Sequence, residues 1–317
     1  NSGYVNGNVV INLNKMIIDR SKVFDVVAED SIGEVIYYNI LYGNDSYRIT
    51  KRRSGVLLDE QGMDVFGQAL NVFGGGHGKD TEIWGSTTIN LTRGYTFQIF
   101  GGGEKGSIGK LWDGSSFKSP SALTVTDYDS RYSTVINMHG SRAGRSKTAD
   151  SNPDMAECEF IYGGGFEGVI LGNATINLGN GRVFNTFAGS CNADILGHTE
   201  TYIGSWPDKN GNEVTGFPWV RDHIYGGNDL GGEIMQEVSF EGRIRNSEVK
   251  SKIFSPKYAS GSTGKTDLLK AASYIEYNQG RVNYIFGGCY GYYDYKSEKF
   301  RNYTNEDGSP KAGFTKP

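Results

Sequence analysis

One short pattern recurs six times along this chain: an aromatic or apolar pair followed by a block of small residues. A fold built from repeated units buries its apolar surface by stacking each unit on the next, so this repetition constrains architecture much more than it constrains activity. The copies are Val72-Phe73-Gly74-Gly75-Gly76, Ile99-Phe100-Gly101-Gly102-Gly103, Ile161-Tyr162-Gly163-Gly164-Gly165, Thr186-Phe187-Ala188-Gly189-Ser190, Ile224-Tyr225-Gly226-Gly227 and Ile285-Phe286-Gly287-Gly288.

A second repeated segment precedes several of these copies at a constant distance. The clearest examples are Thr88-Ile89-Asn90-Leu91, Thr175-Ile176-Asn177-Leu178 and Tyr274-Ile275-Glu276-Tyr277. Both segments are short, rich in β-branched and aromatic residues, and carry apolar side chains two positions apart, which is typical of strands. The glycines at 94, 181 and 280 lie between the two segments and indicate a tight corner.

The sequence therefore predicts a coil made of a strand, a corner, a second strand and a glycine corner. Glycine blocks are about 25 to 27 residues apart where nothing is inserted. Stacked coils pair equivalent strands in parallel, and such crossovers are right-handed. We expect an all-β, single-domain, right-handed parallel β-helix with loop insertions. Residues 64–291 would form its coils, residues 1–63 degenerate N-terminal coils or a cap, and residues 292–317 a C-terminal cap or tail.

Strand alternation also predicts which side chains face inward. Successive side chains of a strand point to opposite faces, so the apolar residues of the first segment should line the core and the asparagines between them should point outward, where stacked amides can bond along the column. The expected inward residues are Ile89, Leu91, Ile176, Leu178 and Ile275, and the expected outward amides are Asn12, Asn90, Asn137 and Asn177.

The glycine blocks and the cysteines each have a structural and a functional interpretation. The glycines either mark corners where coils approach too closely for a Cβ atom, which we expect, or form a backbone nest for an anion. Cys158, Cys191 and Cys289 are odd in number and lack metal-ligand spacing. We therefore expect buried small residues, rather than reactive thiols, and no metal or cofactor.

Composition excludes two classes of partner. The formal net charge of −4 and the isoelectric point of about 5.7 give no electrostatic footprint for nucleic acid. No run of 18 apolar residues occurs, so we expect no membrane span in this chain. Because the sequence begins at Asn1 rather than at methionine, we expect a trimmed mature protein or a fragment.

Insertions carry the residues that could act on a ligand, because loops on a rigid scaffold are where binding usually occurs. Loop carboxylates can serve as acids and bases, and a neighbouring arginine can bind a carbohydrate acid, but short polar residues in loops also bond their own backbone. We expect the latter, and no catalytic residue, because these groups are spread over different corners. If the protein were an enzyme, the candidates would be Asp127, Asp129, Arg131, Asp150 and Asp154.

Aromatic residues outside the repeat are the candidates for ligand binding. Large rings in loops commonly stack on sugar rings, although tyrosines beyond the last repeat could equally cap the column. The candidates are Trp112, Trp206, Trp219, Tyr292 and Tyr293.

The alternation of Thr-Ile-Asn-Leu with Ile-Phe-Gly-Gly-Gly over residues 64–291 resembles the glycine-rich right-handed β-helix proteins of bacterial cell surfaces, the adhesin-like proteins of gut Bacteroidetes among them. The resemblance implies a non-catalytic adhesin or spacer, an extracellular or cell-surface location, and glycans or a surface protein as partners. Two other classes stay open, because fold alone does not decide function. They are a polysaccharide lyase or glycoside hydrolase on a pectate-lyase-like β-helix, and a carbohydrate-binding module.

Overall fold

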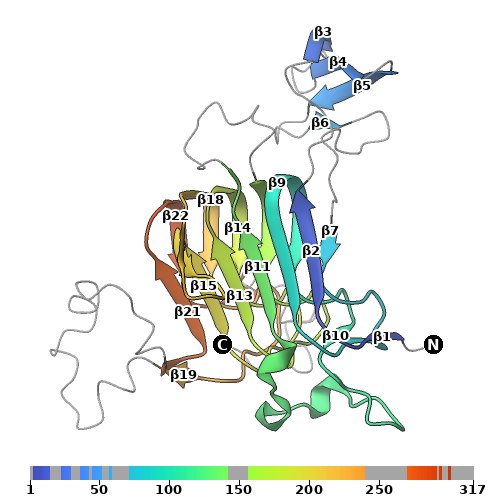
Figure 1. Ribbon diagram of the computed structural model, residues 1–317, viewed down its shortest axis with the longest axis vertical. Coiled ribbons are helices and arrows are strands. Elements are labelled where there is room, and N and C mark those ends of the chain that lie inside the picture. The colour runs from blue at the N-terminus through green and yellow to red at the C-terminus, as the bar shows by residue number, and fades with distance from the viewer. Residues whose placement is uncertain are drawn as a thin grey trace, which may run out of the picture.

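The computed structural model describes residues 3–14, 71–141, 156–239 and 270–290, together with six short strands elsewhere whose backbone alone is described. These parts of the chain are almost entirely β-structure (Figure 1). The main feature is a large parallel sheet that curls into a half-barrel and is compatible with a β-helix. The described residues contain no α-helix, only three short 3-10 helices.

We call the first half of the curled sheet face 1. Each of its strands pairs in parallel with the equivalent strand of the next coil, in chain order. Equivalent residues of the repeat are aligned, so that Ile89 pairs with Ile136 and Ile136 with Ile176. Its strands are β2 (Val9–Asn14), the first half of β9 (Thr87–Phe100), β11 (Thr134–Met138), β13 (Ala174–Leu178), β15 (Thr199–Ile203) and β21 (Ser273–Tyr277).

We call the second half face 2. The long strand β9 belongs to both faces and bends at Gly94, whose φ of 92° lies in the region that favours glycine. The strands of face 2 are also parallel and consecutive. They are β7 (Asn71–Phe73), the second half of β9, β12 (Ala156–Tyr162), β14 (Gly181–Phe187), β18 (Pro218–Tyr225) and β22 (Arg281–Phe286).

A narrower third face closes the coils. It consists of β1 (Gly3–Val5), β8 (Thr81–Ile83) and β10 (Ser107–Ile108), again parallel. Isolated parallel bridges extend it from Ile108 to Ile170, Ile195 and Ile234. Each coil therefore passes through the third face, face 1 and face 2 in turn. The repeat predicts only two strands per coil, so the sequence did not reveal the third face.

The remaining elements are small and antiparallel. Between β2 and β7 the chain forms a four-stranded antiparallel sheet, which is not a continuation of the parallel coils. Its strands are β3 (Val23–Glu29), β4 (Ile36–Tyr42), β5 (Asp45–Lys51) and β6 (Leu57–Leu58). Three two-stranded antiparallel sheets lie elsewhere: β16 (Ser205–Pro207) with β17 (Glu213–Thr215), β19 (Val238–Ser239) with β20 (Lys270–Ala271), and β23 (Tyr293–Asp294) with β24 (Lys299–Phe300). The 3-10 helices η2 (Pro120–Ala122), η3 (Val125–Asp127) and η4 (Ser130–Tyr132) lie in the insertion before β11.

The predicted core and amide ladder are both present. Ile89, Leu91, Ile176 and Leu178 are fully buried in one apolar cluster, against which Ile275 packs at the last coil. On the outer side of face 1, each amide donates to the preceding one: Asn90 to Asn12 at 2.8 Å, Asn137 to Asn90 at 2.8 Å, and Asn177 to Asn137 at 2.7 Å. Strand alternation predicted both sets because burial on one side fixes the register.

The glycine corners confirm close approach between coils. A Cβ atom on Gly101 would collide with the carbonyl oxygen of Gly163, and one on Gly163 with that of Ala188. The N–H groups that an anion nest would need instead donate to the next coil, as Gly102 does to Gly164 at 3.0 Å. The nest interpretation is therefore wrong for this corner.

The aromatic member of each glycine motif forms a second column, which we call the aromatic ladder. Neighbouring rings stack with centroids 4.6 to 5.2 Å apart and planes within 5° to 11° of parallel. Most of these rings are buried in a cluster separate from the main core. The ladder runs through Phe73, Phe100, Tyr162, Phe187, Tyr225 and Phe286.

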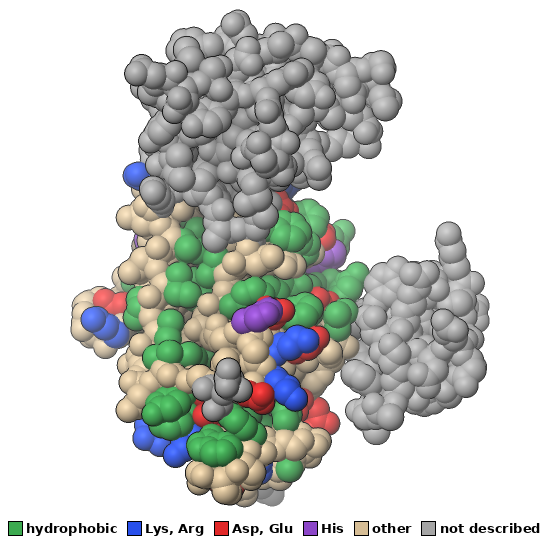
Figure 2. Space-filling view, turned by 90° about the vertical axis from the view of Figure 1, so that its right-hand side faces the viewer, with side chains coloured by type: hydrophobic (Ala, Val, Ile, Leu, Met, Phe, Trp, Pro, Cys, Tyr) green, Lys and Arg blue, Asp and Glu red, His purple; other side chains and the backbone are tan. Residues whose placement is uncertain are grey.

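Both ends of the column expose apolar side chains. The N-terminal end, which faces the viewer in Figure 2, exposes Tyr4, Val5 and Val10. The opposite end exposes Ile285 and Phe286, whose equivalents in inner coils are buried. Among the residues that the structure describes, each end coil therefore has a parallel neighbour on one side only.

Candidate functional site

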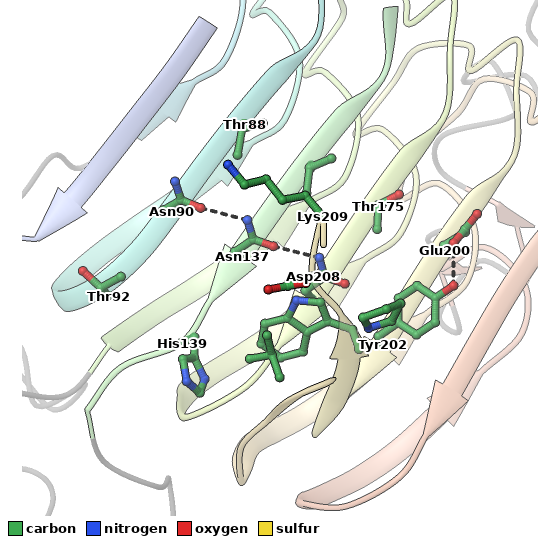
Figure 3. Close-up of a pocket in the computed structure, with 15 residues that line it drawn as sticks. Thr88, Asn90, Thr92, Asn137, His139, Thr175, Glu200, Tyr202, Asp208 and Lys209 are labelled. Atoms are coloured by element: carbon green, nitrogen blue, oxygen red, sulfur yellow. Dashed lines mark hydrogen bonds between the residues drawn. The ribbon is translucent and has the colours of Figure 1, made fainter. Parts of the chain in front are cut away.

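A groove of about 960 Å³ lies on the outer side of face 1 (Figure 3). Its floor consists of the outward side chains of β9, β11, β13 and β15, and its wall comes from the hairpin β16–β17. Because these strands are in register, the floor consists of rows of equivalent residues, one from each coil. One row holds Thr88, Val135, Thr175 and Glu200, and the next holds Asn90, Asn137, Asn177 and Tyr202.

The amide ladder leaves hydrogen-bonding capacity in this floor. An amide has two N–H donors, and the ladder uses one donor of each bonded amide. At the end of the ladder, Asn177 is only 6% exposed, and its Oδ1 accepts no hydrogen bond from any residue that the structure describes. Buried polar atoms are almost always paired, so this acceptor indicates a missing donor.

The hairpin wall is held against the floor by Trp206 and His139. Their rings meet edge to face, with centroids 5.6 Å apart. Gly179 lies beneath both, and a Cβ atom there would collide with each ring. Trp206, expected from sequence to bind ligand, therefore lies in the groove, although it is 6% exposed.

His139 is a neutral hydrogen-bonding group in this groove. Its Nδ1 accepts the backbone N–H of Asn180 at 3.2 Å, which assigns the proton of the neutral ring to Nε2. Burial of the ring lowers the pKa of His139 below its usual value. At neutral pH His139 therefore offers an N–H donor rather than a positive charge.

A carboxylate replaces the repeat residue at the far end of the floor. Glu200 binds His198 Nε2 through Oε1 at 2.7 Å and accepts the hydroxyl of Tyr202 through Oε2 at 2.6 Å. In the next strand the order is reversed, since the hydroxyl of Tyr274 donates to Glu276 at 2.9 Å. Sequence analysis missed Glu200 and Tyr202 as site residues, although their departure from the Thr and Asn of the outward rows was a usable signal.

The tip of the hairpin adds a second carboxylate and an ammonium. Asp208 accepts the backbone N–H groups of Asn210 and Asn212, each at 2.8 Å, and the bond from Asn212 is the largest cause of its lowered pKa. The neighbouring Lys209 is exposed and extends toward β9 (Figure 3). Both charges therefore lie on the wall of the groove.

The carboxylates expected for an enzyme lie elsewhere. Asp129 pairs with Arg131 at 2.6 Å and is the N-cap of η4. Asp127 pairs with Lys118 at 2.5 Å and accepts the backbone N–H of Thr124, the N-cap of η3. These side-chain hydrogen bonds lower the pKa of both aspartates. None of them lines the groove. Asp150 and Asp154 lie outside the described residues.

The other predicted aromatic residues do not join Trp206. Trp112 packs against Phe117, with centroids 5.1 Å apart, and its backbone N–H donates to the buried Glu82 at 2.7 Å. Trp219 lies on face 2 between the guanidinium groups of Arg182 and Arg281, at 5.8 and 5.0 Å. Tyr293 begins β23, and Tyr292 lies outside the described residues.

The prediction that the cysteines are buried is confirmed for two of the three. Cys158 and Cys191 are buried, as expected, and burial raises the pKa of both thiols, that of Cys191 to about 12. Cys289 is exposed, so the expectation of burial was wrong there, because no described strand pairs with the last coil on its outer side. Within the described ranges no three His, Cys, Asp or Glu residues form a group that could hold a metal ion, and no helix is long and apolar enough to cross a membrane.

Comparison with known proteins gives no relative for this chain. No family model matches it, and neither does any curated protein or solved structure.

Proposed function

We propose that this protein is a non-catalytic right-handed β-helix that is secreted or displayed on a cell surface as an adhesin or spacer, and that it binds a glycan in the groove on face 1. The observation that carries the proposal is the groove itself. Its floor carries an amide on three successive strands, at Asn90, Asn137 and Asn177, and its wall includes the largely buried indole ring of Trp206. Sugars offer hydroxyl groups to such donors and acceptors, and apolar ring faces to aromatic side chains.

The hydrogen bonds that already hold the ionisable groups of the groove support a binding role rather than a catalytic one. Glu200 is held between His198 and Tyr202, and Asp208 between two backbone N–H groups of its own turn. General acid–base catalysis requires a group with access to the reacting atom and a pKa suited to proton transfer. A carboxylate whose two oxygens already accept hydrogen bonds from the protein is better suited to act as a fixed acceptor than to transfer a proton.

Binding to immobilised polysaccharides would test the proposal. Trp206→Ala and Asn137→Ala should each weaken binding at least tenfold, while Trp112→Ala, which removes an indole outside the groove, should leave it unchanged. Circular dichroism of each variant would verify folding. Equal binding by all three variants, or loss only in Trp112→Ala, would contradict a ligand site on face 1.

One observation favours a second candidate function, a polysaccharide lyase or hydrolase. Glu200 and Tyr202 both line the groove and share a hydrogen-bonded chain with His198. Product formation from a polysaccharide, abolished in Glu200→Gln with binding retained, would favour this enzyme over the non-catalytic role.

A further inference from the structure

We propose that the groove selects a neutral, extended glycan chain that lies along the amide ladder, so that affinity rises with the number of sugar units. This inference rests on the proposed glycan binding and adds the class and direction of the ligand. Three features of the groove carry it: its charges, its repeat distance and the unsatisfied acceptor at Asn177.

The charges of the groove argue for a neutral ligand. His139 is neutral, and Glu200 and Asp208 are carboxylates that bind protein donors. Lys209 is the one lysine or arginine among the described residues that line the groove, and Asp208 precedes it on the same turn. An acidic polymer would bring a negative charge with each acidic unit, but the groove offers a single ammonium group and two carboxylates. Repulsion and desolvation would therefore oppose its binding.

The repeat distance argues for an extended chain. Neighbouring strands of a sheet lie about 4.8 Å apart, so the amides of Asn90, Asn137 and Asn177 present equivalent N–H groups at that interval along the column. A single sugar reaches one or two of these positions. A chain aligned with the ladder reaches all of them but loses translational and rotational entropy only once. Each added sugar unit therefore contributes to affinity until the ladder is covered.

The acceptor at Asn177 indicates where one hydroxyl of the ligand would bond. Asn177 lines the groove, is 94% shielded from solvent and has an Oδ1 atom that receives no donor from any described residue. This oxygen is covered in the free protein, so a sugar hydroxyl can donate to it only once the side chains over it move aside, whereas an ionised carboxylate or sulfate at this point has no proton to give. A site with an unpaired buried acceptor rejects ligands that leave it unpaired.

A two-stage binding experiment tests this inference. The intact protein is first applied to immobilised neutral polysaccharides (glucans, mannans and xylans) and acidic ones (polygalacturonate, alginate and a sulfated glycan). Oligomers of one to six units of the best binder are then titrated by calorimetry at 50 and 500 mM NaCl. We expect a neutral polymer to bind best, affinity to rise at least tenfold from dimer to tetramer, and salt to change it less than twofold.

Two variants test the role of the acceptor. Asn177→Leu should weaken oligomer binding at least tenfold, while Asn283→Leu, at an exposed amide on face 2, should not change it. If Asn177→Leu fails to fold, Asn177→Ala removes the same acceptor oxygen without adding apolar bulk, and it should also weaken oligomer binding at least tenfold.

Other outcomes separate this inference from the proposed function. Preference for an acidic polymer, a salt effect above tenfold, or equal affinity for monomer and hexamer would overturn the inference while leaving glycan binding in place. Absence of binding to every polysaccharide would overturn both.

Discussion

The hydroxyl of Thr134 donates a 2.6 Å hydrogen bond to the carbonyl oxygen of Gly163, at the glycine corner of the same coil. Thr87 bonds Gly101 and Thr199 bonds Gly226 in the same way, at 2.5 and 2.8 Å. These threonines face inward and are fully buried. The bond therefore ties the start of face 1 to the end of face 2 across the inside of the coil.

This bond predicts opposite effects for two buried threonines of face 1. Thr134→Val removes a donor from the Gly163 carbonyl and should lower the free energy of unfolding by about 1 to 2 kcal/mol. Thr201 is equally buried, but its hydroxyl has no partner among the described residues, so Thr201→Val should raise the free energy of unfolding by up to about 1 kcal/mol. Urea denaturation of both variants measures the difference, and a loss of stability in Thr201→Val would contradict it.

The glycine corners predict a position-dependent cost for adding one methyl group. Gly163→Ala places a Cβ atom against the carbonyl oxygen of Ala188 and should cost about 1 to 3 kcal/mol through overpacking. Gly287→Ala, at the open end of the column, meets no atom within 4 Å and should change stability by less than about 0.5 kcal/mol. Thermal unfolding of the two variants provides the comparison, and similar melting temperatures would show that coils can separate to accept the methyl group.

A buried carboxyl predicts that stability falls as pH rises. Asp229 is 9% exposed and accepts the hydroxyl of Tyr162 at 3.1 Å, and burial raises its pKa to about 6. Since the unfolded pKa is lower, near 3.8, the native state binds more protons between about pH 4 and 6. The free energy of unfolding should fall across that window by at most about 3 kcal/mol.

Asp229→Asn tests this pH dependence directly. The variant keeps an acceptor for Tyr162 but cannot ionise, so its stability should change less with pH than that of the unmodified protein, and it should be the more stable of the two at pH 8. Parallel urea titrations at pH 4, 6 and 8 measure this. Identical pH profiles would mean that Asp229 titrates as an exposed carboxyl does.

The core predicts a large effect in the middle of the column and a small one at its end. Ile161 is fully buried, whereas Ile285, at the equivalent position of the last coil, is 44% exposed. Ile161→Ala should cost about 2 to 5 kcal/mol, because it opens a cavity that the neighbouring coils cannot fill. Ile285→Ala should cost less than half of that value. Equal losses in chemical denaturation would indicate that the last coil is covered as fully as the inner ones.

The sequence predicted those features that each coil repeats. Ile89 and Ile176 are in the core, and Asn90 and Asn177 are in the ladder, because a period of two residues and a buried face leave a strand one register. The glycine blocks were also interpreted correctly as close contacts. Repetition made these predictions possible, since each coil supplied an independent copy of the same evidence.

The site was predictable only in part, because it depends on contacts between an insertion and distant coils. Trp206 was recognised as an aromatic residue outside the repeat, but its contact with His139 follows from the fold of the hairpin. Asp127 and Asp129 are close together in sequence, but each is bound to its own cation and bonds the start of its own 3-10 helix. Proximity along the chain did not place them at a common site.

The difference in burial between Ile285 and Ile161 also indicates where local unfolding of the molecule begins. In the described part of the chain, each inner coil pairs with two neighbours and an end coil with one, so an end coil separates by breaking one of these interfaces, while an inner coil must break two. Backbone amides should therefore exchange with deuterium fastest in β22 and progressively more slowly toward β12 and β14. Such a gradient would make the column fray from its tip inward, so that thermal motion is concentrated beyond the groove while its central rungs stay rigid.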